Sequence, residues 1–173
     1  MVKVSILKTD LGWMAFAYEG KKLLANSIPF QDKDNAMEFL RIRLLKRGIY
    51  NFSIDLKNLI NEMEPSFEDL SKFHKKVLKL TMKIPRGRVL SYRELSKLIN
   101  ERAYRAVGRV LANNPFPIII PCHRVIRSDG SLGGYTGGKK LKEFLLRSEG
   151  VEIVNGKIKG KYLLSSSELI HRF

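Results

Sequence analysis

The sequence predicts an α+β fold, with a small antiparallel sheet and one helix first and a mostly helical part after them. Three short runs in the first third read as strands joined by turns, whereas hydrophobic residues later recur at helical spacing. Charge divides the chain in the same way. Residues 1–64 carry 10 Lys/Arg and 8 Asp/Glu, and residues 65–173 carry 22 and 9. The polar, proline-terminated stretch 61–65 marks the predicted boundary between two domains, 1–64 and 65–173.

The first domain is predicted to be an antiparallel meander followed by a helix and one more strand. The strands are expected over residues 3–7, 13–18, 22–28 and 49–54. The helix spans about residues 33–47, with Asp32 or Asp34 as its N-cap and Gly48 at its end. Nothing in this domain indicates chemistry, so we interpret it as a scaffold.

The second domain contains four predicted helices and little sheet. They span about residues 71–83, 91–99, 103–112 and 139–149, with a short strand at 88–90. Ser91 and Glu94 fit a capping box at the start of the second helix. Asn155-Gly156 predicts a hairpin between residues 151–154 and 157–159.

The helices at 91–99 and 103–112 have the spacing of a helix-turn-helix, which predicts a winged-helix-like DNA-binding domain. Arginines recur along one face of the second helix, and small residues beside them permit close approach to a flat partner. These residues are Arg102, Arg105 and Arg109, and Ala103, Ala106 and Gly108. A solvated surface would explain the total charge of +15, but it would not explain why the excess is confined to this domain.

Cys122 is the single cysteine, and His123 follows it. The preceding Ile118–Ile120 run predicts a buried strand or extended segment, and prolines at 117 and 121 forbid helix. A free thiol has a pKa near ~8.5, and an imidazole in contact would raise its thiolate fraction. Neighbours on a strand point to opposite faces, so the two side chains can meet only if the chain turns at Pro121. The alternative is a buried, inert cysteine.

Composition excludes several kinds of protein. One cysteine excludes an internal disulfide and a thiolate-rich zinc site, and neither a metal nor a cofactor is expected. The glycine-rich loop 133–138 is not a phosphate-binding P-loop, because no Gly-Lys-Ser/Thr ending follows. No apolar run approaches a membrane span and no signal-peptide pattern is present, so we expect a soluble, intracellular protein.

Several motifs occur together in order between residues 65 and 150. They are Ser91-Tyr92, Arg105-Ala106-Val107-Gly108, Asn114-Pro115, Pro-Cys-His-Arg-Val at 121–125, Tyr135-Thr136-Gly137-Gly138 and Leu145 to Gly150. This set resembles the O6-alkylguanine-DNA alkyltransferases, also called methylated-DNA–protein-cysteine methyltransferases. The resemblance implies a DNA repair protein that moves the alkyl group of O6-alkylguanine to its own cysteine in one irreversible turnover. O4-alkylthymine stays open as a second substrate.

The resemblance also implies roles for the reacting groups. Cys122 corresponds to the alkyl acceptor, His123 to its base through a bridging water, and Glu149 to the group that orients His123. Asn114 is similar to the asparagine that braces the turn between the recognition helix and the active-site segment. Arg105 resembles the arginine that replaces a flipped base in the stack.

For the base itself, Tyr92 resembles the tyrosine that rotates the 3′ phosphate and helps neutralise the departing purine. Thr136 stands where the family usually has serine, near the guanine O6, and Tyr135 would pack on the base. The backbone carbonyls of Cys122 and Val125 would accept from the exocyclic amine. Arg109 departs from the family, which commonly has a small residue there, and no zinc site is possible.

The expected partner is double-stranded DNA that contains O6-alkylguanine, bound by a monomer in the cytoplasm, or in the nucleus of a eukaryote. Two alternatives remain. A cysteine hydrolase would need an acyl substrate and an oxyanion hole, for which the sequence has no separate signal. A non-catalytic binder of alkylated DNA would not need Cys122.

Overall fold

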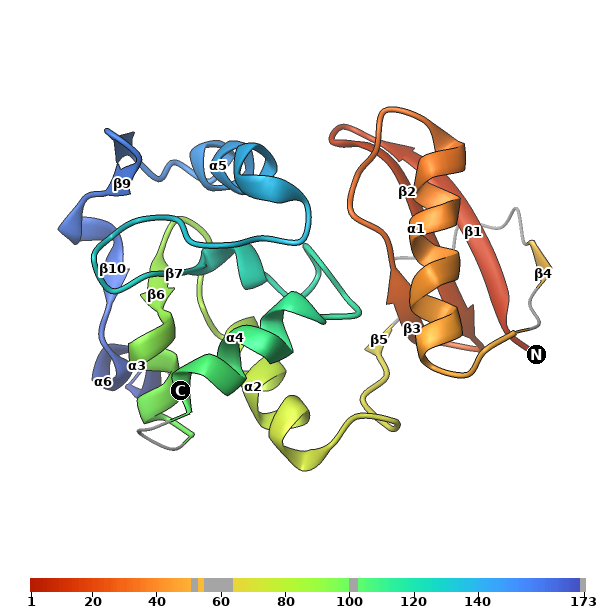
Figure 1. Ribbon diagram of the computed structural model, residues 1–173, viewed down its shortest axis with the longest axis horizontal. Helices are drawn as coiled ribbons and strands as arrows, with labels where there is room; N and C mark the ends of the chain where they lie inside the picture. The colour runs from red at the N-terminus through yellow and green to blue at the C-terminus, as the bar shows by residue number, and fades with distance from the viewer. Residues whose placement is uncertain (51–52, 55–63, 100–102, 172–173) are drawn as a thin grey trace. The chain divides into compact units, whose positions relative to one another are not determined.

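A computed structural model describes residues 1–50, 53–54, 64–99 and 103–171. Contacts divide the chain into two compact units (Figure 1). The first contains Met1–Leu70 together with Pro115–Pro117, and the second contains Ser71–Asn114 and Ile118–Phe173. Residues 61–63 of the predicted boundary lie outside the described residues, so the assignment of domains 1–64 and 65–173 stays a prediction.

The first unit is a five-stranded sheet in the order β4-β1-β2-β3-β5, and Figure 1 shows one helix, α1, across its face. Strands β1, β2 and β3 are antiparallel, and the short edge strands β4 and β5 run parallel to their neighbours. The elements are β1 (Lys3–Thr9), β2 (Gly12–Glu19), β3 (Lys22–Asn26), α1 (Lys33–Lys46), β4 (Ser53–Ile54) and β5 (Glu64–Pro65).

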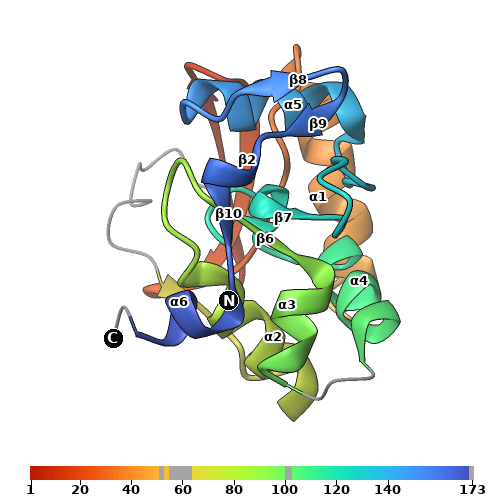
Figure 2. The same cartoon turned by 90° about the vertical axis from the view of Figure 1, so that its left-hand side faces the viewer.

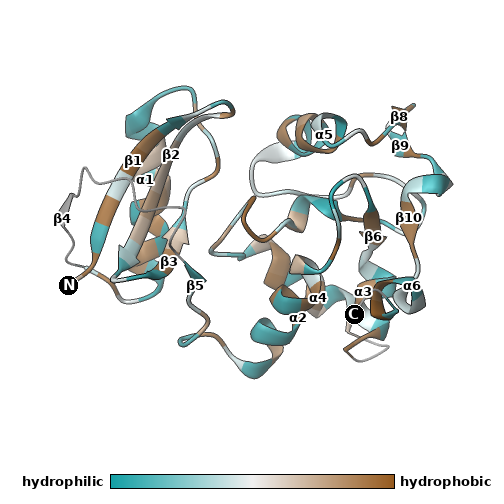
Figure 3. Cartoon of the chain, turned by 180° about the vertical axis from the view of Figure 1, so that it is seen from behind, coloured by the Kyte–Doolittle hydropathy of each residue, from teal (hydrophilic) through white to brown (hydrophobic). Residues whose placement is uncertain are grey.

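Local sequence explains these elements. Gly12 closes the β1–β2 turn at φ 123°, and a Cβ there would lie 2.5 Å from the carbonyl oxygen of Phe30, so only glycine fits. The Asp32 side chain accepts from the amide of Asn35 at 2.8 Å, which identifies it as the N-cap of α1. Leu40 of α1 is fully buried with Val4 and Ala15 of the sheet. Figure 3 shows hydrophobic and hydrophilic segments mixed along β1, and five consecutive residues of β2, Met14 to Tyr18, are buried.

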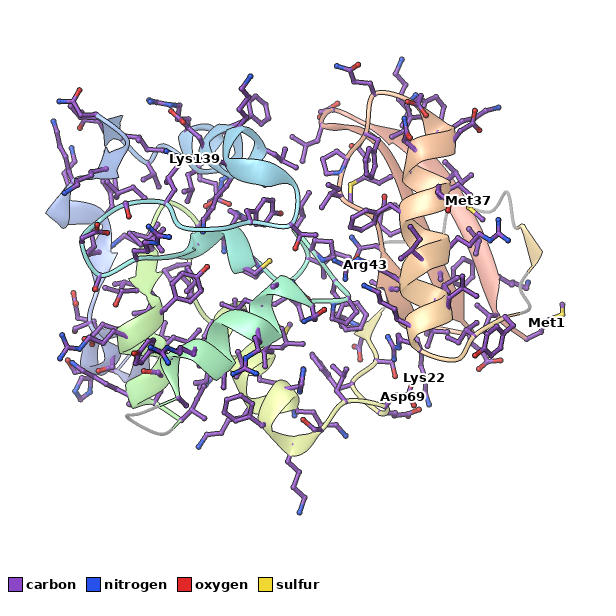
Figure 4. The ribbon with its side chains drawn as sticks, viewed as in Figure 1. Met1, Lys22, Met37, Arg43, Asp69 and Lys139 are labelled. Atoms are coloured by element: carbon purple, nitrogen blue, oxygen red, sulfur yellow. The ribbon has the colours of Figure 1, made fainter. Side chains whose placement is uncertain are left out.

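Segment Pro115–Pro117 belongs to the first unit through Asn26, whose side chain is fully buried. The amide of Asn26 donates to the carbonyl of Pro115 and its Nδ2 donates to that of Pro117, both at 2.9 Å. Phe116 meets the ring of Phe67 edge-on at 5.9 Å. At one end of this unit, Lys22 pairs with Glu68 and Asp69 with Arg47; Figure 4 labels Lys22 and Asp69 there.

Within the described residues, the second unit combines five α-helices and two 3-10 turns with two small sheets, of which β10-β6-β7 is parallel and β8-β9 is a hairpin (Figure 2). Helices α2, α3 and α4 contact one another. In order, the elements are α2 (Lys72–Met82), β6 (Val89–Ser91), α3 (Tyr92–Lys97), α4 (Tyr104–Ala112), a 3-10 turn (Cys122–Arg124), β7 (Val125–Ile126), α5 (Gly138–Ser148), β8 (Ile153–Val154), β9 (Lys157–Ile158), a 3-10 turn (Gly160–Tyr162), β10 (Leu163–Leu164) and α6 (Ser166–Ile170).

The α+β fold class is confirmed, and so is the hairpin at Asn155-Gly156, where both residues have positive φ. The predicted capping box of α3 is half right. The Ser91 hydroxyl accepts from the amide of Glu94 at 3.1 Å, but the Glu94 carboxylate accepts from the amide of Ser166 at 2.8 Å instead of turning back to Ser91. The amide of Ser166, at the start of α6, is 72 residues away in the sequence, so the local pattern around Ser91 does not predict this donor.

The buried strand or extended segment predicted at Ile118–Ile120 is wrong. Ile118 and Ile119 form a turn, with Ile118 at φ 74° and Ile119 38% exposed, and only Ile120 is fully buried. A β-branched residue at positive φ is strained and persists only where its surroundings impose it. Within the second unit, the carbonyl of Ile120 accepts from Nδ2 of Asn114 at 3.1 Å and from the amide of Cys122 at 2.7 Å, which fixes the chain directly after Ile118 and Ile119.

Candidate active site

A turn at Pro121 places Cys122. Pro121 has φ −78° and ψ 60°, and the amide of Cys122 donates to the carbonyl of Ile120 at 2.7 Å, which is the geometry of an inverse γ-turn. Cys122–Arg124 then form a single 3-10 turn. The chain therefore turns at Pro121, the position at which the sequence analysis placed a turn if Cys122 and His123 are to meet. Cys122 and His123 do not alternate across a strand, and they are 5% and 2% exposed.

Asn114 joins the end of α4 to this turn. Its Nδ2 donates to the carbonyl of Ile120 at 3.1 Å and to Sγ of Cys122 at 3.2 Å, and the residue is 1% exposed. An amide N–H that points at sulfur favours the thiolate over the thiol, because hydrogen bonds to a charged acceptor are stronger. Asn114 thus links the end of α4 to the turn before Cys122, and it also contacts the sulfur of Cys122.

His123 is held by Glu149 at the C-terminus of α5. Its Nε2 lies 2.8 Å from Oε1 of the carboxylate. Since an ionised carboxylate only accepts, Nε2 carries the proton, and Nδ1 of the neutral ring keeps a lone pair. Among the described residues, the buried Nδ1 has no hydrogen-bond partner. This nitrogen is the one left to accept a proton.

Burial and hydrogen bonding shift the pKa values of His123 and Glu149 in opposite directions. Burial lowers the pKa of His123, and this outweighs the hydrogen bond to Glu149, which raises it. Burial would raise the pKa of Glu149, but bonds from His123 and Arg124 overcome this and hold it at about 2. The resting site at neutral pH is thus a neutral imidazole on an ionised carboxylate.

Cys122 lies on the wall of a cavity of about 290 Å³. The other lining residues come from the start of α3, from α4 and from the glycine-rich loop: Tyr92, Gly108, Leu111, Ala112, Gly134, Tyr135 and Thr136. The structure thus brings the predicted residues Tyr92, Tyr135 and Thr136 together with the cysteine. The hydroxyl of Thr136 donates to the carbonyl of Ala112 at 3.1 Å, which ties the loop to α4.

A larger hollow of about 970 Å³ shares Tyr92, Gly108 and Gly134 with this cavity. Its walls carry three guanidinium groups, those of Arg93, Arg105 and Arg127. Arg105 is exposed, and its guanidinium lies 5.8 Å from the ring centre of Tyr104. A wide basic hollow that leads to a small apolar-walled cavity beside a thiol is suited to a polyanion with one group inserted.

Of the residues predicted to contact DNA or the base, Ala106, Arg109 and Val125 line neither hollow. Ala106 is half-buried and Arg109 is exposed, both on α4, whereas Arg102 lies outside the described residues. Val125 is fully buried behind the cysteine. Its carbonyl, predicted to accept from a guanine amine, accepts from Nζ of Lys142 at 2.6 Å. A carbonyl has a second lone pair, so this bond leaves the prediction open.

Lys142 and Arg124 are the site residues that the sequence analysis did not single out. Lys142 of α5 is fully buried, donates also to the carbonyl of Gly134 at 3.2 Å, and lies 5.8 Å from the ring centre of Tyr92. Burial lowers its pKa to about 8. The signal was present in the sequence, because Lys142 shares the apolar face of α5 with Leu145 and Leu146 at spacings of three and four.

Comparison with known proteins gives the family. Residues 72–151 match the family model of the 6-O-methylguanine DNA methyltransferase DNA-binding domain. The chain is 47% identical over 87 residues to a methylated-DNA–protein-cysteine methyltransferase of Methanothermobacter thermautotrophicus, a match that spans 50% of this chain and 49% of that protein. It is 32% identical over 169 residues to the protein of that name from Methanocaldococcus jannaschii, across 91% of this chain and 99% of that one.

A crystal structure agrees with the sequence matches. The O6-methylguanine-DNA methyltransferase of the hyperthermophilic archaeon Pyrococcus kodakaraensis superposes with a TM-score of 0.69 and 32% identity, over 87% of this chain and 100% of that chain. The match to the Methanocaldococcus jannaschii protein spans nearly the whole of both chains. The chain belongs to the family of methylated-DNA–protein-cysteine methyltransferases.

Proposed function

We propose that this chain repairs DNA by transferring the alkyl group of O6-alkylguanine to Sγ of Cys122. One observation carries the proposal: the thiol of Cys122 lies on the wall of a small cavity, and Nδ2 of Asn114 is 3.2 Å from the sulfur. His123, the next residue of the same 3-10 turn, is hydrogen-bonded to Glu149 at the end of α5. The family match, which includes a DNA-binding domain model over residues 72–151, and the +13 balance of residues 65–173 support DNA as the partner.

The reaction balances without a further reactant. The Cys122 thiol gives its proton to His123 through a bridging water, and the sulfur attacks the saturated carbon attached to O6. A sulfur–carbon bond forms while the carbon–oxygen bond breaks, and its electron pair stays with guanine. Guanine takes up one proton, which offsets the one that Cys122 released, so His123 ends neutral. The product is a thioether, which has no electrophilic carbonyl for water to attack. The protein therefore acts once.

The base must leave the duplex to reach the thiol, at a cost of a few kcal/mol. We assign Arg105 to the gap in the stack, and Tyr92, Tyr135 and Thr136 to the flipped base, since these three line the cavity with Cys122. The small residues Ala106 and Gly108 would allow α4 to approach the groove. Arg109, with Arg102, would contact phosphates.

Intact-mass measurement after incubation with a duplex that contains O6-methylguanine tests the function. We expect each protein molecule to gain one CH2, as a methyl replaces the thiol hydrogen, and peptide mapping should place it on Cys122. Cys122→Ser keeps the size of the side chain and should gain nothing while it still binds the duplex. Binding without any mass gain in the wild type would favour the alternative of a non-catalytic binder.

Turnover of a chromogenic ester would favour the alternative of a hydrolase. His123→Ala should slow transfer and move the pKa of the thiol toward that of free cysteine; an unchanged titration would remove His123 as the activator. Among the described residues, no helix is long and apolar enough to span a bilayer. A monomer in the cytoplasm is part of the proposal.

A further inference from the structure

Arg124, the residue after His123, makes a partly buried ion pair that the reaction described above does not use. Its Nε donates to Oε2 of Glu149 at 2.9 Å and its Nη2 to Oε1 at 2.8 Å, which is a two-point contact between two flat groups. Nη1 donates to the carbonyl of Ile84 at 2.7 Å. The side chains of Arg124 and Glu149 are 16% and 9% exposed. Little solvent is therefore available to screen the pair.

The same carboxylate holds the histidine. Oε1 of Glu149 accepts hydrogen bonds from Nη2 of Arg124 and from Nε2 of His123, each at 2.8 Å. The amide of Gly87 donates to Oε2 at 3.3 Å. The ring of His123 thus faces an ion pair whose charges cancel, rather than a lone carboxylate. A lone carboxylate at this distance would favour the imidazolium, whereas a neutralised one can still orient the ring through its hydrogen bond.

We propose that Arg124 is a positioning residue for the thiol-activating histidine: its guanidinium neutralises Glu149, so that Glu149 fixes the His123 ring without holding a permanent proton on it. The proposal rests on the proposed function, in which His123 accepts a proton from Cys122. An imidazolium at rest has no lone pair on Nδ1 and cannot accept that proton. In this proposal, activation of the thiol depends on four residues: Cys122, His123, Glu149 and Arg124.

The other charged and titratable groups around His123 are consistent with this assignment. Lys142 of α5 adds a second positive charge that disfavours the imidazolium, as Arg124 does, and Glu149 favours it. The phenol ring of Tyr135, from the glycine-rich loop, meets the imidazole edge-on with centroids 6.4 Å apart. Cys122 precedes His123 in the same turn. Burial is the largest influence, and it acts in the same direction as the two cations.

Three variants of the full chain separate charge from structure. Arg124→Gln removes the positive charge, Arg124→Lys keeps the charge and loses the two-point contact, and Arg147→Gln is the control. Arg147 lies two residues before Glu149 on α5, but it pairs with Glu143 on the surface and is 51% exposed. The pKa of His123 is measured by NMR of the ring in the absence of DNA, and the rate of methyl transfer to a duplex is measured against pH.

In Arg124→Gln we expect the pKa of His123 to rise and the low-pH limb of the transfer profile to move up with it. Below both pKa values, each unit of that rise lowers the neutral fraction of the ring, and so the rate, about tenfold. Arg124→Lys should keep the His123 titration close to that of the wild type, and Arg147→Gln should match the wild type in both measurements.

An unchanged His123 titration in Arg124→Gln would overturn the proposal, and so would an equal rise in Arg124→Lys, since that would make geometry rather than charge the cause. If Arg124→Gln does not fold, the lysine variant decides: a low pKa supports the proposal and a raised one refutes it. The NMR titration needs no DNA. A wild type that transfers no methyl group would therefore refute the proposed function without being confused with failure of this inference.

Discussion

The bond from Asn114 to the sulfur of Cys122 can be tested by deleting it. Asn114→Ala removes the Nδ2 donor 3.2 Å from Sγ. A hydrogen bond to a charged group contributes about 1.5–3 kcal/mol, which corresponds to a rise of about 1–2 in the pKa of the thiol. The carbonyl of Ile120 loses the same donor but keeps the amide of Cys122 at 2.7 Å, so the γ-turn has its own support.

The ultraviolet absorbance of the thiolate, followed against pH, measures this change directly, and the rate of alkylation by iodoacetamide gives a second readout. Asn114→Asp should raise the pKa of the thiol further, because it places a carboxylate beside the developing thiolate. Asn113→Ala is the matched control: Asn113 is the neighbouring residue, is exposed, and donates to the carbonyl of Arg109. If Asn114→Ala and Asn113→Ala titrate alike, the amide does not stabilise the thiolate and Asn114 is only a brace.

Three further predictions concern charge. Arg105→Ala should reduce repair of duplex DNA far more than it weakens binding, and it should leave transfer from free O6-benzylguanine nearly unchanged. Equal losses of transfer on both substrates would assign Arg105 to the pocket instead. Arg109→Ala should lower the slope of log affinity against log salt concentration by about 0.9. The pKa of Glu149 is held at about 2 against an ordinary 4.5, so the stability it contributes is present above 4.5 and is lost as pH falls toward 2. Acid unfolding of Glu149→Gln should lack this dependence, and curves that superimpose on the wild type would contradict it. The pKa of Lys142 is lowered from 10.5 to about 8, so its buried charge destabilises the fold fully below pH 8, and the cost disappears as pH rises to 10.5. The wild type should therefore gain stability relative to Lys142→Met between pH 8 and 10, as measured by urea unfolding at each pH.

Much of the fold is determined by local sequence. Asp32 caps α1 because an aspartate oxygen reaches an amide three residues on, and Asn155-Gly156 forms a hairpin because both residues tolerate positive φ. The sequence also indicated that a turn at Pro121 is the condition for Cys122 and His123 to lie together, since neighbours on a strand point to opposite faces, and the turn is present. These features depend on groups a few residues apart, and their preferences survive in any tertiary setting.

The tertiary structure decided which distant groups complete the site. Glu149 lies 26 residues from His123, and only the end of α5 packed against the 3-10 turn brings the two within 2.8 Å. No local pattern predicts the partners of Arg124 and Lys142, because the carbonyls and the carboxylate that they contact come from distant parts of the chain. The turn at Ile118 has the same origin. Its hydrophobic run favours a strand, but the hydrogen bonds that Asn114 and the amide of Cys122 make to the carbonyl of Ile120 outweigh that preference.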